Sequence, residues 1–239
     1  MSGDGQHRER LRGVLLDVDG TLIDSNDAHA RSWSDALREF GRAVSPDDVR
    51  PLIGMGGDKL LPRLLGVDAE SDVGRRFAKR RAQIFRDAYV PHLRLTSGAR
   101  DLVKRLRAEE LKLIIATSAA ESELNVMLEQ VGLDELIEKK TSSADADRSK
   151  PDPDIVQAAL AKAGLSPAAA IMLGDTPYDI EAADRACVPA VGLLCGGWTA
   201  DALSGAVAIY EDPADVVQHF TSSPFSRAWS SPDRSGTTR

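Results

Sequence analysis

The sequence is poor in cysteine and has no long apolar run. Its two cysteines, Cys187 and Cys195, are too few for the disulfide framework of a small secreted protein, and they lack the spacing of a metal site. No apolar run approaches the roughly 18–20 residues of a membrane-spanning helix. Residues 1–10 lack the apolar segment of a signal peptide. We therefore expect a cytoplasmic protein with no membrane partner.

The sequence also lacks an excess of basic residues. Lysine and arginine total 30, against 37 aspartate and glutamate residues, which gives a formal net charge of −7. Nucleic-acid-binding proteins need clustered positive charge to contact the phosphate backbone, so we expect no nucleic-acid partner. A small phosphorylated metabolite is compatible with this charge, because a few local cations or a metal ion suffice to bind it. The length of 239 residues fits one or two domains.

Short apolar segments alternate with helical patterns over most of the chain. Such an alternation indicates β-α-β units and a parallel sheet that helices cover on both faces. The expected strands are residues 13–18, 111–117, 138–142, 170–174, 190–194 and 207–210, of which 138–142 is the most polar. The expected helices are residues 99–108, 120–131, 153–163, 178–187 and 213–220. The fold class is therefore α/β.

Residues 24–95 interrupt this alternation, because they contain several helical stretches and no convincing strand. The spacing of Trp33, Leu37 and Phe40, for example, predicts a helix over residues 28–40. A helical insertion after the first strand would lie above the carboxyl ends of the strands, where open α/β sheets bind ligands.

This pattern divides the chain into two expected domains. Residues 11–23 and 96–220 form the α/β core, and residues 24–95 form an all-helical domain inserted into it. Residues 1–10 and 221–239 are polar and contain too few apolar side chains to pack, so we expect both ends to be disordered.

Asp17 and Asp19 follow the first expected strand directly, in the segment Asp-Val-Asp-Gly-Thr. Side chains two residues apart in an extended chain share a face, so the two carboxylates point the same way. Two neighbouring negative charges at a strand end are unfavourable unless a cation or a raised pKa relieves them. The pattern therefore favours a functional site over a solvated acidic loop.

Further polar residues follow the other expected strands. Thr117 and Ser118 end the second strand, where a hydroxyl can donate a hydrogen bond to an anionic oxygen. Lys150 precedes a proline that stiffens its loop, and the segment Gly-Asp-Thr-Pro-Tyr-Asp supplies Asp175 and Asp179. Because the carboxyl ends of parallel strands meet at one edge of a sheet, these residues can share one crevice.

Together, these motifs resemble the four motifs of the haloacid dehalogenase superfamily of phosphohydrolases, over about residues 13–220. Residues 24–95 resemble the helical cap of the first type, as in the phosphoglycolate phosphatase and β-phosphoglucomutase branch. The resemblance implies a Rossmann-like parallel-sheet core under a mobile helical cap, with Mg²⁺ as cofactor. It also implies a phosphatase for a small phosphorylated metabolite, such as a sugar phosphate or a phosphoglycolate-like acid.

The resemblance implies specific roles for five residues. Asp17 and Asp175 bind Mg²⁺ through their carboxylates, and Asp19 binds it through its backbone carbonyl. A phosphate monoester is dianionic, so a carboxylate can attack it only after charge neutralisation by a cation. Asp17 is then the nucleophile that forms an aspartyl-phosphate, and Asp19 is the acid and base. Thr117 and Lys150 hold the oxygens of the transferring phosphoryl group.

Four supporting residues are candidates beside these. Asp179 is expected to orient Lys150 or the metal site, with capping of the following helix as the alternative. Ser118 and His29 are candidate substrate contacts, and His29 lies where the resemblance places the first cap helix. Lys59 follows a glycine-rich loop and either contacts an anionic leaving group or points to water.

The remaining basic cluster, Arg75-Arg76 and Lys79-Arg80-Arg81, is expected to form a solvated helix face, because it has helical spacing in an acidic chain.

Other activities are known within the same family. Dehalogenases lack the second carboxylate and phosphonate hydrolases replace it, so Asp19 argues against both, although Lys59 lies in the cap region where the latter carry a Schiff-base lysine. A sugar phosphomutase of the β-phosphoglucomutase type is the main alternative, because it differs only in the acceptor of the phosphoryl group. A non-catalytic binding module is a second alternative, which the intact set of motif residues disfavours.

Overall fold

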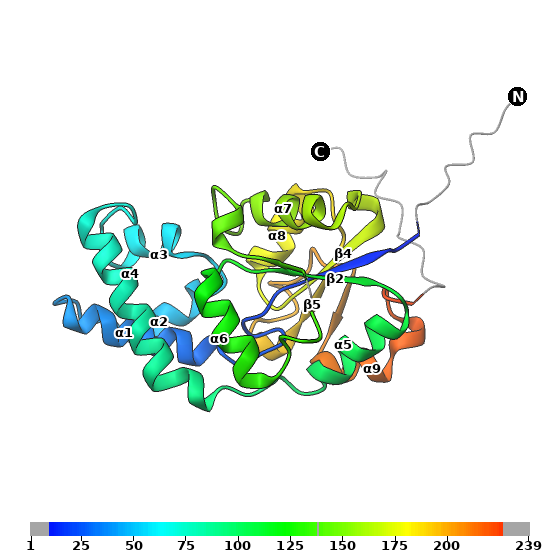
Figure 1. The fold of residues 1–239 in the computed structure, drawn as a ribbon, viewed down its shortest axis with the longest axis horizontal. Coiled ribbons are helices and arrows are strands. Elements are labelled where there is room, and N and C mark those ends of the chain that lie inside the picture. Colours follow the sequence, from blue (N-terminus) through cyan, green and yellow to red (C-terminus); the bar gives the residue numbers. More distant parts are fainter. Residues whose placement is uncertain (1–9, 138, 227–239) are drawn as a thin grey trace, which may run out of the picture.

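The computed structural model describes residues 10–137 and 139–226, and its centre is a six-stranded parallel sheet (Figure 1). The strands lie in the order β3-β2-β1-β4-β5-β6. They are β1 (Gly13–Leu16), β2 (Lys112–Ala116), β3 (Lys139–Thr141), β4 (Ala170–Gly174), β5 (Ala190–Leu193) and β6 (Ala208–Tyr210). Each expected strand is present, which confirms the α/β class. The strand order reverses between β1 and β4, and open α/β sheets bind ligands at such a point.

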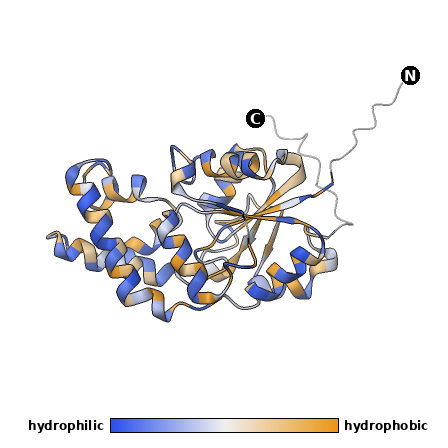
Figure 2. Cartoon of the chain, viewed as in Figure 1, coloured by the Kyte–Doolittle hydropathy of each residue, from blue (hydrophilic) through white to orange (hydrophobic). Residues whose placement is uncertain are grey.

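Helices cover both faces of the sheet, as the continuous apolar strands predict (Figure 1). On β1, Val14 and Leu16 pack on one face and Leu15 packs on the other. The first face is covered by α5 (Ala99–Ala108), α6 (Glu121–Val131) and α9 (Pro213–Gln218), and the second by α7 (Asp154–Ala163) and α8 (Pro177–Arg185). Hydrophobic residues accordingly concentrate in the strands between these layers (Figure 2).

The segment between β1 and α5 is helical, as predicted, and we call residues 24–95 the helical insertion. Its helices are α1 (Asn26–Glu39), α2 (Pro46–Val49), α3 (Gly57–Leu64) and α4 (Asp72–Ile84), with a π-helical turn at Phe85–Tyr89 and 3₁₀ turns at Arg50–Leu52 and Val90–His92. The insertion lies beside the carboxyl end of β1 (Figure 1). It has its own core, in which the Phe77 ring lies 5.2 Å from Trp33 and 5.1 Å from Phe40.

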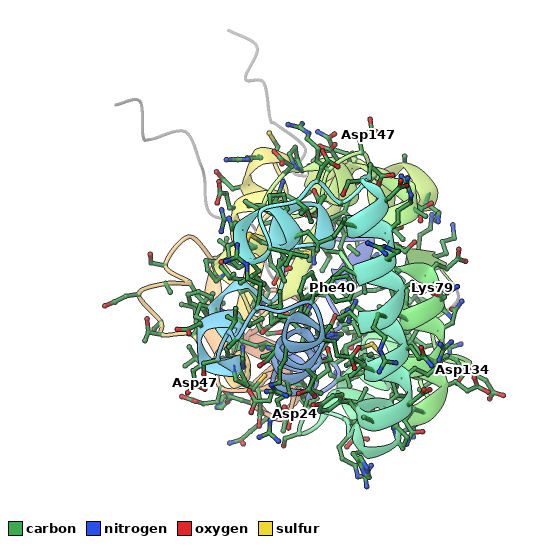
Figure 3. The ribbon with its side chains drawn as sticks, turned by 90° about the vertical axis from the view of Figure 1, so that its left-hand side faces the viewer. Asp24, Phe40, Asp47, Lys79, Asp134 and Asp147 are labelled. Atoms are coloured by element: carbon green, nitrogen blue, oxygen red, sulfur yellow. The ribbon has the colours of Figure 1, made fainter. Side chains whose placement is uncertain are left out.

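The outer face of the insertion is polar, as Figure 3 shows from that side of the molecule. Lys79 on α4 points outward there, and Arg80 forms an exposed ion pair with Glu39. Both residues therefore lie on the solvated helix face that the sequence predicts. Arg81, the next residue, does not, and it is described below with the site.

The end of the described chain is more ordered than the sequence predicts. A 3₁₀ turn at Phe220–Ser222 follows α9, and Phe225 is buried in the core on the α5 face of the sheet. The expectation of disorder is therefore wrong for residues 221–226, because Phe225 supplies an apolar anchor. Residues 1–9 and 227–239 lie outside the described residues. Within residues 10–137 and 139–226, the helices are too short or too polar for any of them to span a bilayer.

Candidate active site

Three neighbouring strands place the predicted motif residues at one edge of the sheet. Asp17 follows β1, Thr117 follows β2 and Asp175 follows β4, and these strands are adjacent in the order β2-β1-β4. Lys150 comes from the loop between β3 and α7, and its ammonium nitrogen lies 2.6 Å from Asp17 Oδ1. Residues that are far apart in the sequence therefore meet at the point where the strand order reverses, as predicted.

Lys150 is buried between two carboxylates. Its side chain is 0% exposed, and its Nζ donates to Asp17 Oδ1 at 2.6 Å and to Asp179 Oδ1 at 2.7 Å. Burial acts to lower the pKa of Lys150, but Asp17 and Asp179 outweigh it and raise the pKa above its ordinary value. Lys150 is therefore a fixed positive charge beside Asp17.

Asp179 has two functions at once, and both were considered from the sequence. Its Oδ1 accepts from Lys150, while its Oδ2 accepts from the Thr176 backbone N–H at 3.0 Å and from Thr176 Oγ1 at 2.7 Å. The Thr176 hydroxyl in turn accepts from the Asp179 N–H, which completes a capping box at the start of α8. The helix start thus fixes the carboxylate that positions Lys150.

Asp175 is held by two residues, Thr21 and Asn26, to which the sequence analysis assigned no role. Thr21 Oγ1 donates to Asp175 Oδ1 and Asn26 Nδ2 donates to Asp175 Oδ2, both at 2.9 Å. The backbone also approaches closely, because a Cβ added to Gly20 or Gly196 would lie 2.2 Å or 1.9 Å from Asp175 Oδ2. Asn26 carries no distinguishing signal in the sequence, since it is simply the first residue of the helix that follows β1.

The carboxylates at this edge repel one another. Burial raises the pKa of Asp175 to about 7, with a further contribution from Asp179, and hydrogen bonds from Asn26 and Thr21 oppose it. Burial likewise raises the pKa of Asp17 well above its ordinary value; Lys150 acts against this, and the neighbouring carboxylates add to it. A single buried lysine therefore does not balance the negative charge that this cluster carries when it is ionised.

The donor set fits a hard divalent cation such as Mg²⁺. Carboxylate oxygens of Asp17, Asp175 and Asp179 all lie within 4.8 Å of one another. Magnesium prefers oxygen ligands, and an added positive charge would relieve the repulsion between these groups. Asn26 Oδ1 is also buried here and has no hydrogen-bond partner among the described residues. Asp17 and Asp175, which follow the adjacent strands β1 and β4, could hold the ion. They already accept hydrogen bonds from Lys150, Thr21 and Asn26, so they would bind it through their remaining lone pairs.

Asp19 turns toward the helical insertion instead of joining this cluster. Its Oδ1 accepts from Ser25 Oγ at 2.5 Å and lies 2.7 Å from His29 Nε2 on α1. Burial acts to raise the pKa of Asp19, but the attraction and hydrogen bond of His29, with the bond from Ser25, lower it overall. The Asp19 carboxylate is thus free of the metal-ligating group and paired with an imidazole.

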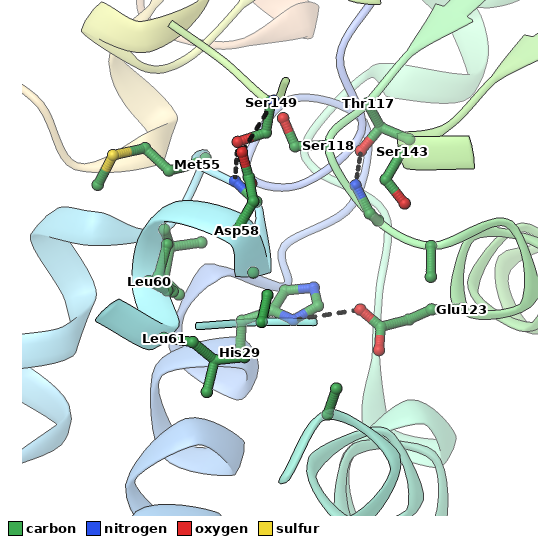
Figure 4. A pocket seen from close by; sticks show the side chains of 18 of the residues that line it. His29, Met55, Asp58, Leu60, Leu61, Thr117, Ser118, Glu123, Ser143 and Ser149 are labelled. Carbon is green, nitrogen blue, oxygen red and sulfur yellow. Dashed lines mark hydrogen bonds and ion pairs between the residues drawn. The ribbon is translucent and has the colours of Figure 1, made fainter. Parts of the chain in front are cut away.

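A cavity of about 510 Å³ opens above Asp17 and Asp19, between the insertion and the strand ends (Figure 4). His29, Thr117 and Ser118, the candidate substrate contacts, are among its lining residues. Thr117 Oγ1 accepts from the Ala119 N–H at 3.1 Å, and Ser118 Oγ accepts from the Lys150 N–H at 3.3 Å. Both hydroxyl groups thus retain a hydrogen atom that they can donate into the cavity.

The glycine-rich loop also lines the cavity, but Lys59 does not. Gly54 to Asp58 are all lining residues. Lys59 Nζ instead donates to Asp152 Oδ2 at 2.6 Å, because the start of α3 docks against the loop that carries Lys150. The structure therefore places the loop as predicted and gives Lys59 a protein partner in place of a leaving group.

Arg81 and Glu123 are cavity residues that the sequence analysis missed. Arg81 is only 14% exposed, so the expectation of a solvated face is wrong for this residue. Its Nη1 lies 3.0 Å from Glu123 Oε2 on α6 and 3.4 Å from His29 Nδ1 (Figure 4 shows Glu123 and His29). The π-helical turn after α4 brings Phe85 under His29, with ring centroids 4.1 Å apart. Arg81 and Glu123 come together because α4 packs near α6. The local sequence around either residue therefore does not indicate the pairing.

The chain is similar to known proteins in sequence and in fold. Residues 14–193 match the protein family described as haloacid dehalogenase-like hydrolase. The chain is 31% identical over 191 residues to a phosphoglycolate phosphatase from Pseudomonas putida, across 77% of this chain and 70% of that protein. The crystal structure of a hydrolase from Pseudomonas syringae matches with a TM-score of 0.81 and 30% identity, across 89% of this chain and 98% of that one. A beta-phosphoglucomutase from Clostridium difficile shares the fold, with a TM-score of 0.77, 16% identity and coverage of 90% and 97%.

Proposed function

Because the chain belongs to the haloacid dehalogenase-like hydrolase family, we propose that it is a magnesium-dependent phosphatase that hydrolyses a small phosphomonoester through an aspartyl-phosphate intermediate. The observation that carries the proposal is the buried pairing of Asp17, which lines the cavity, with Lys150, 2.6 Å away. A carboxylate held beside a fixed cation at the edge of a cavity is suited to attack a dianionic phosphate.

In the first step, an Asp17 carboxylate oxygen attacks phosphorus, and the bond between phosphorus and the ester oxygen breaks. Lys150 and the Thr117 hydroxyl bind the equatorial oxygens of the transferring group, where negative charge collects in the transition state. A magnesium ion bound by Asp17 and Asp175 would neutralise the substrate dianion and so allow a carboxylate to approach it. Asp179 keeps Lys150 in place through its bond of 2.7 Å.

Proton transfer is assigned to the pair Asp19 and His29. The two groups are 2.7 Å apart and share one hydrogen bond. The proton shared between Asp19 Oδ1 and His29 Nε2 passes through Asp19 to the departing alkoxide oxygen, so the pair as a unit loses one proton in this step. In the second step Asp19 takes a proton from the water that attacks the aspartyl-phosphate. The bond between phosphorus and the Asp17 oxygen breaks in this step, so the products of both steps are the alcohol, inorganic phosphate and free Asp17.

Two alternatives are less well supported by the site. A Schiff-base reaction needs an amine in the cavity, whereas the Lys59 amine is bound to Asp152. The second alternative is a phosphomutase. The fold that this chain shares with the beta-phosphoglucomutase does not favour that reaction, because at 16% identity the likeness shows the fold alone.

The test is magnesium-dependent release of phosphate from p-nitrophenyl phosphate. The wild type is expected to turn over with Mg²⁺ and to lose activity with excess chelator, whereas Asp17→Asn is expected to be inactive in both conditions. Asp24→Asn is the matched control, because Asp24 lies in the same loop, is exposed and does not line the cavity. No turnover by the wild type over a panel of phosphate esters would support a non-catalytic binding module instead.

A further inference from the structure

We propose that the organic part of the substrate carries no negative charge of its own, so that esters bearing a carboxylate or a second phosphate are poor substrates. This inference rests on the proposed phosphatase activity. It concerns the part of the cavity that faces away from Lys150, where the leaving group must lie once the phosphoryl group is at Asp17.

The cationic side chains that could bind such an anion are already paired with carboxylates. Among the described residues that line the cavity, the arginines and lysines are Arg75 and Arg81. Arg75 is 58% exposed at the rim and forms an ion pair with Asp72. Arg81 lies deeper, at 14% exposed, and is therefore the residue that decides the charge preference of the cavity.

Arg81 is held by Glu123 through both terminal nitrogens. Nη1 and Nη2 donate to Glu123 Oε1 at 3.1 Å and 3.2 Å, and Nη1 also lies 3.0 Å from Oε2. The guanidinium is further fixed over the Trp33 and Phe85 rings, 5.6 Å and 5.7 Å from their centroids. Glu123 is 6% exposed, so displacing it would strand a buried carboxylate without a partner. Replacing Glu123 with a substrate anion as the partner of Arg81 therefore costs free energy.

Besides Arg75, Arg81 and His29, the charged side chains of the lining are acidic, and the neutral residues are apolar or small or carry a serine or threonine hydroxyl. Asp58 stands in the first turn of α3, where its carboxylate already meets the positive end of that helix and accepts from the Ser149 N–H at 3.2 Å. Glu70 and Asp147, both exposed like Arg75, add negative charge at the rim. The larger apolar side chains of the lining are those of Trp33, Ile53, Met55, Leu60, Leu61 and Ile155. An uncharged leaving group with some apolar surface fits these walls, whereas a second anion meets repulsion.

The experiment uses pairs of substrates that match in length and differ in charge. In the first pair, phosphoglycolate carries a carboxylate where 2-hydroxyethyl phosphate carries a hydroxymethyl group. In the second pair, 3-phosphoglycerate and glycerol 3-phosphate differ in the same way. For the wild type with Mg²⁺, we expect the neutral member of each pair to have the higher kcat/KM, by about tenfold. The carboxylate of the anionic member lies near acidic side chains and finds no unpaired cation to bind it. A ratio of one or less in either pair overturns the proposal.

A variant tests whether Glu123 is the cause. Glu123→Gln frees the charge of Arg81, which stays over the Trp33 and Phe85 rings, so the kcat/KM for phosphoglycolate relative to 2-hydroxyethyl phosphate should rise by about tenfold. Glu121→Gln is the matched control, because Glu121 is exposed on the same helix and does not line the cavity, and its ratio should stay at the wild-type value. An unchanged ratio in folded Glu123→Gln, checked by its melting curve, refutes the assignment.

The same preparations separate this inference from the proposed function. Turnover of p-nitrophenyl phosphate with Mg²⁺ reports the phosphatase activity alone. If that activity is present and the anionic esters are preferred, only the charge preference fails. If the enzyme releases phosphate from none of the esters, both the phosphatase proposal and the inferred charge preference are wrong.

Discussion

The change Asp179→Asn tests whether one buried carboxylate both caps α8 and positions Lys150. An aspartate has two acceptor oxygens, and here Oδ1 serves Lys150 while Oδ2 serves the N–H and hydroxyl of Thr176. An asparagine has one acceptor oxygen and an NH₂ group that can accept from neither partner. Either the cap or the Lys150 contact must therefore be lost, in a site where Asp179 is buried.

The magnitude follows from the two opposing effects. Losing a buried hydrogen bond to a charged group costs about 1.5–3 kcal/mol, and a poorly paired lysine adds to that cost. Removing one negative charge also relieves the repulsion that Asp179 exerts on Asp17 and Asp175. The net expectation is a loss of about 2 kcal/mol in the free energy of unfolding.

The assay is urea-induced unfolding followed by circular dichroism, in the presence of chelator so that metal binding does not contribute. Asp154→Asn is the matched control, because Asp154 lies in the first turn of the neighbouring helix α7 and, among the residues that the structure describes, pairs only with exposed Arg148, at 3.3 Å. This control is expected to change the midpoint little. If Asp179→Asn unfolds at the same urea concentration as Asp154→Asn, the argument about the buried carboxylate is wrong.

Three further predictions concern individual site residues. Asp19→Ala should lower kcat by about 10²-fold or more for an alkyl phosphate and much less for p-nitrophenyl phosphate, whose leaving group needs little protonation; equal losses in steady-state assays would make Asp19 structural. Asp175→Ala should raise the Mg²⁺ concentration for half-maximal activity by about tenfold or more, and an unchanged metal titration would remove Asp175 from the site. Lys59→Ala should change KM by less than about twofold, because Lys59 pairs with Asp152; a larger KM increase confined to anionic esters would make Lys59 a substrate ligand.

The layered core could be predicted because the strands other than the polar β3 are short, apolar and bounded by polar residues. Val14 and Leu16 face one layer of helices and Leu15 faces the other, so β1 reads as a continuous apolar run. The insertion could be predicted because residues 24–95 have helical periodicity and contain no apolar strand pattern. Phe225 was missed because a single apolar residue in a polar tail has no periodicity, and its burial depends on a surface built by distant helices.

The motif residues of the site could be placed because parallel strands bring their carboxyl ends together. What the sequence could not supply is the direction of each side chain beyond the strand ends. Asp19 turns to His29, and Lys59 finds Asp152 in another loop. Arg81 and Glu123 pair only because α4 lies over α6, a tertiary contact without any local pattern.

The most direct test of the aspartyl-phosphate mechanism is to trap the intermediate on Asp17. Enzyme turning over a phosphate ester with Mg²⁺ is quenched into borohydride, which reduces an acyl phosphate to an alcohol, and the peptides are mapped by mass spectrometry. The mechanism predicts homoserine at position 17, dependent on substrate and on Mg²⁺ and absent from Asp17→Asn. Unmodified Asp17 in an enzyme that releases phosphate, with reduction at another carboxylate such as Asp19, would contradict it.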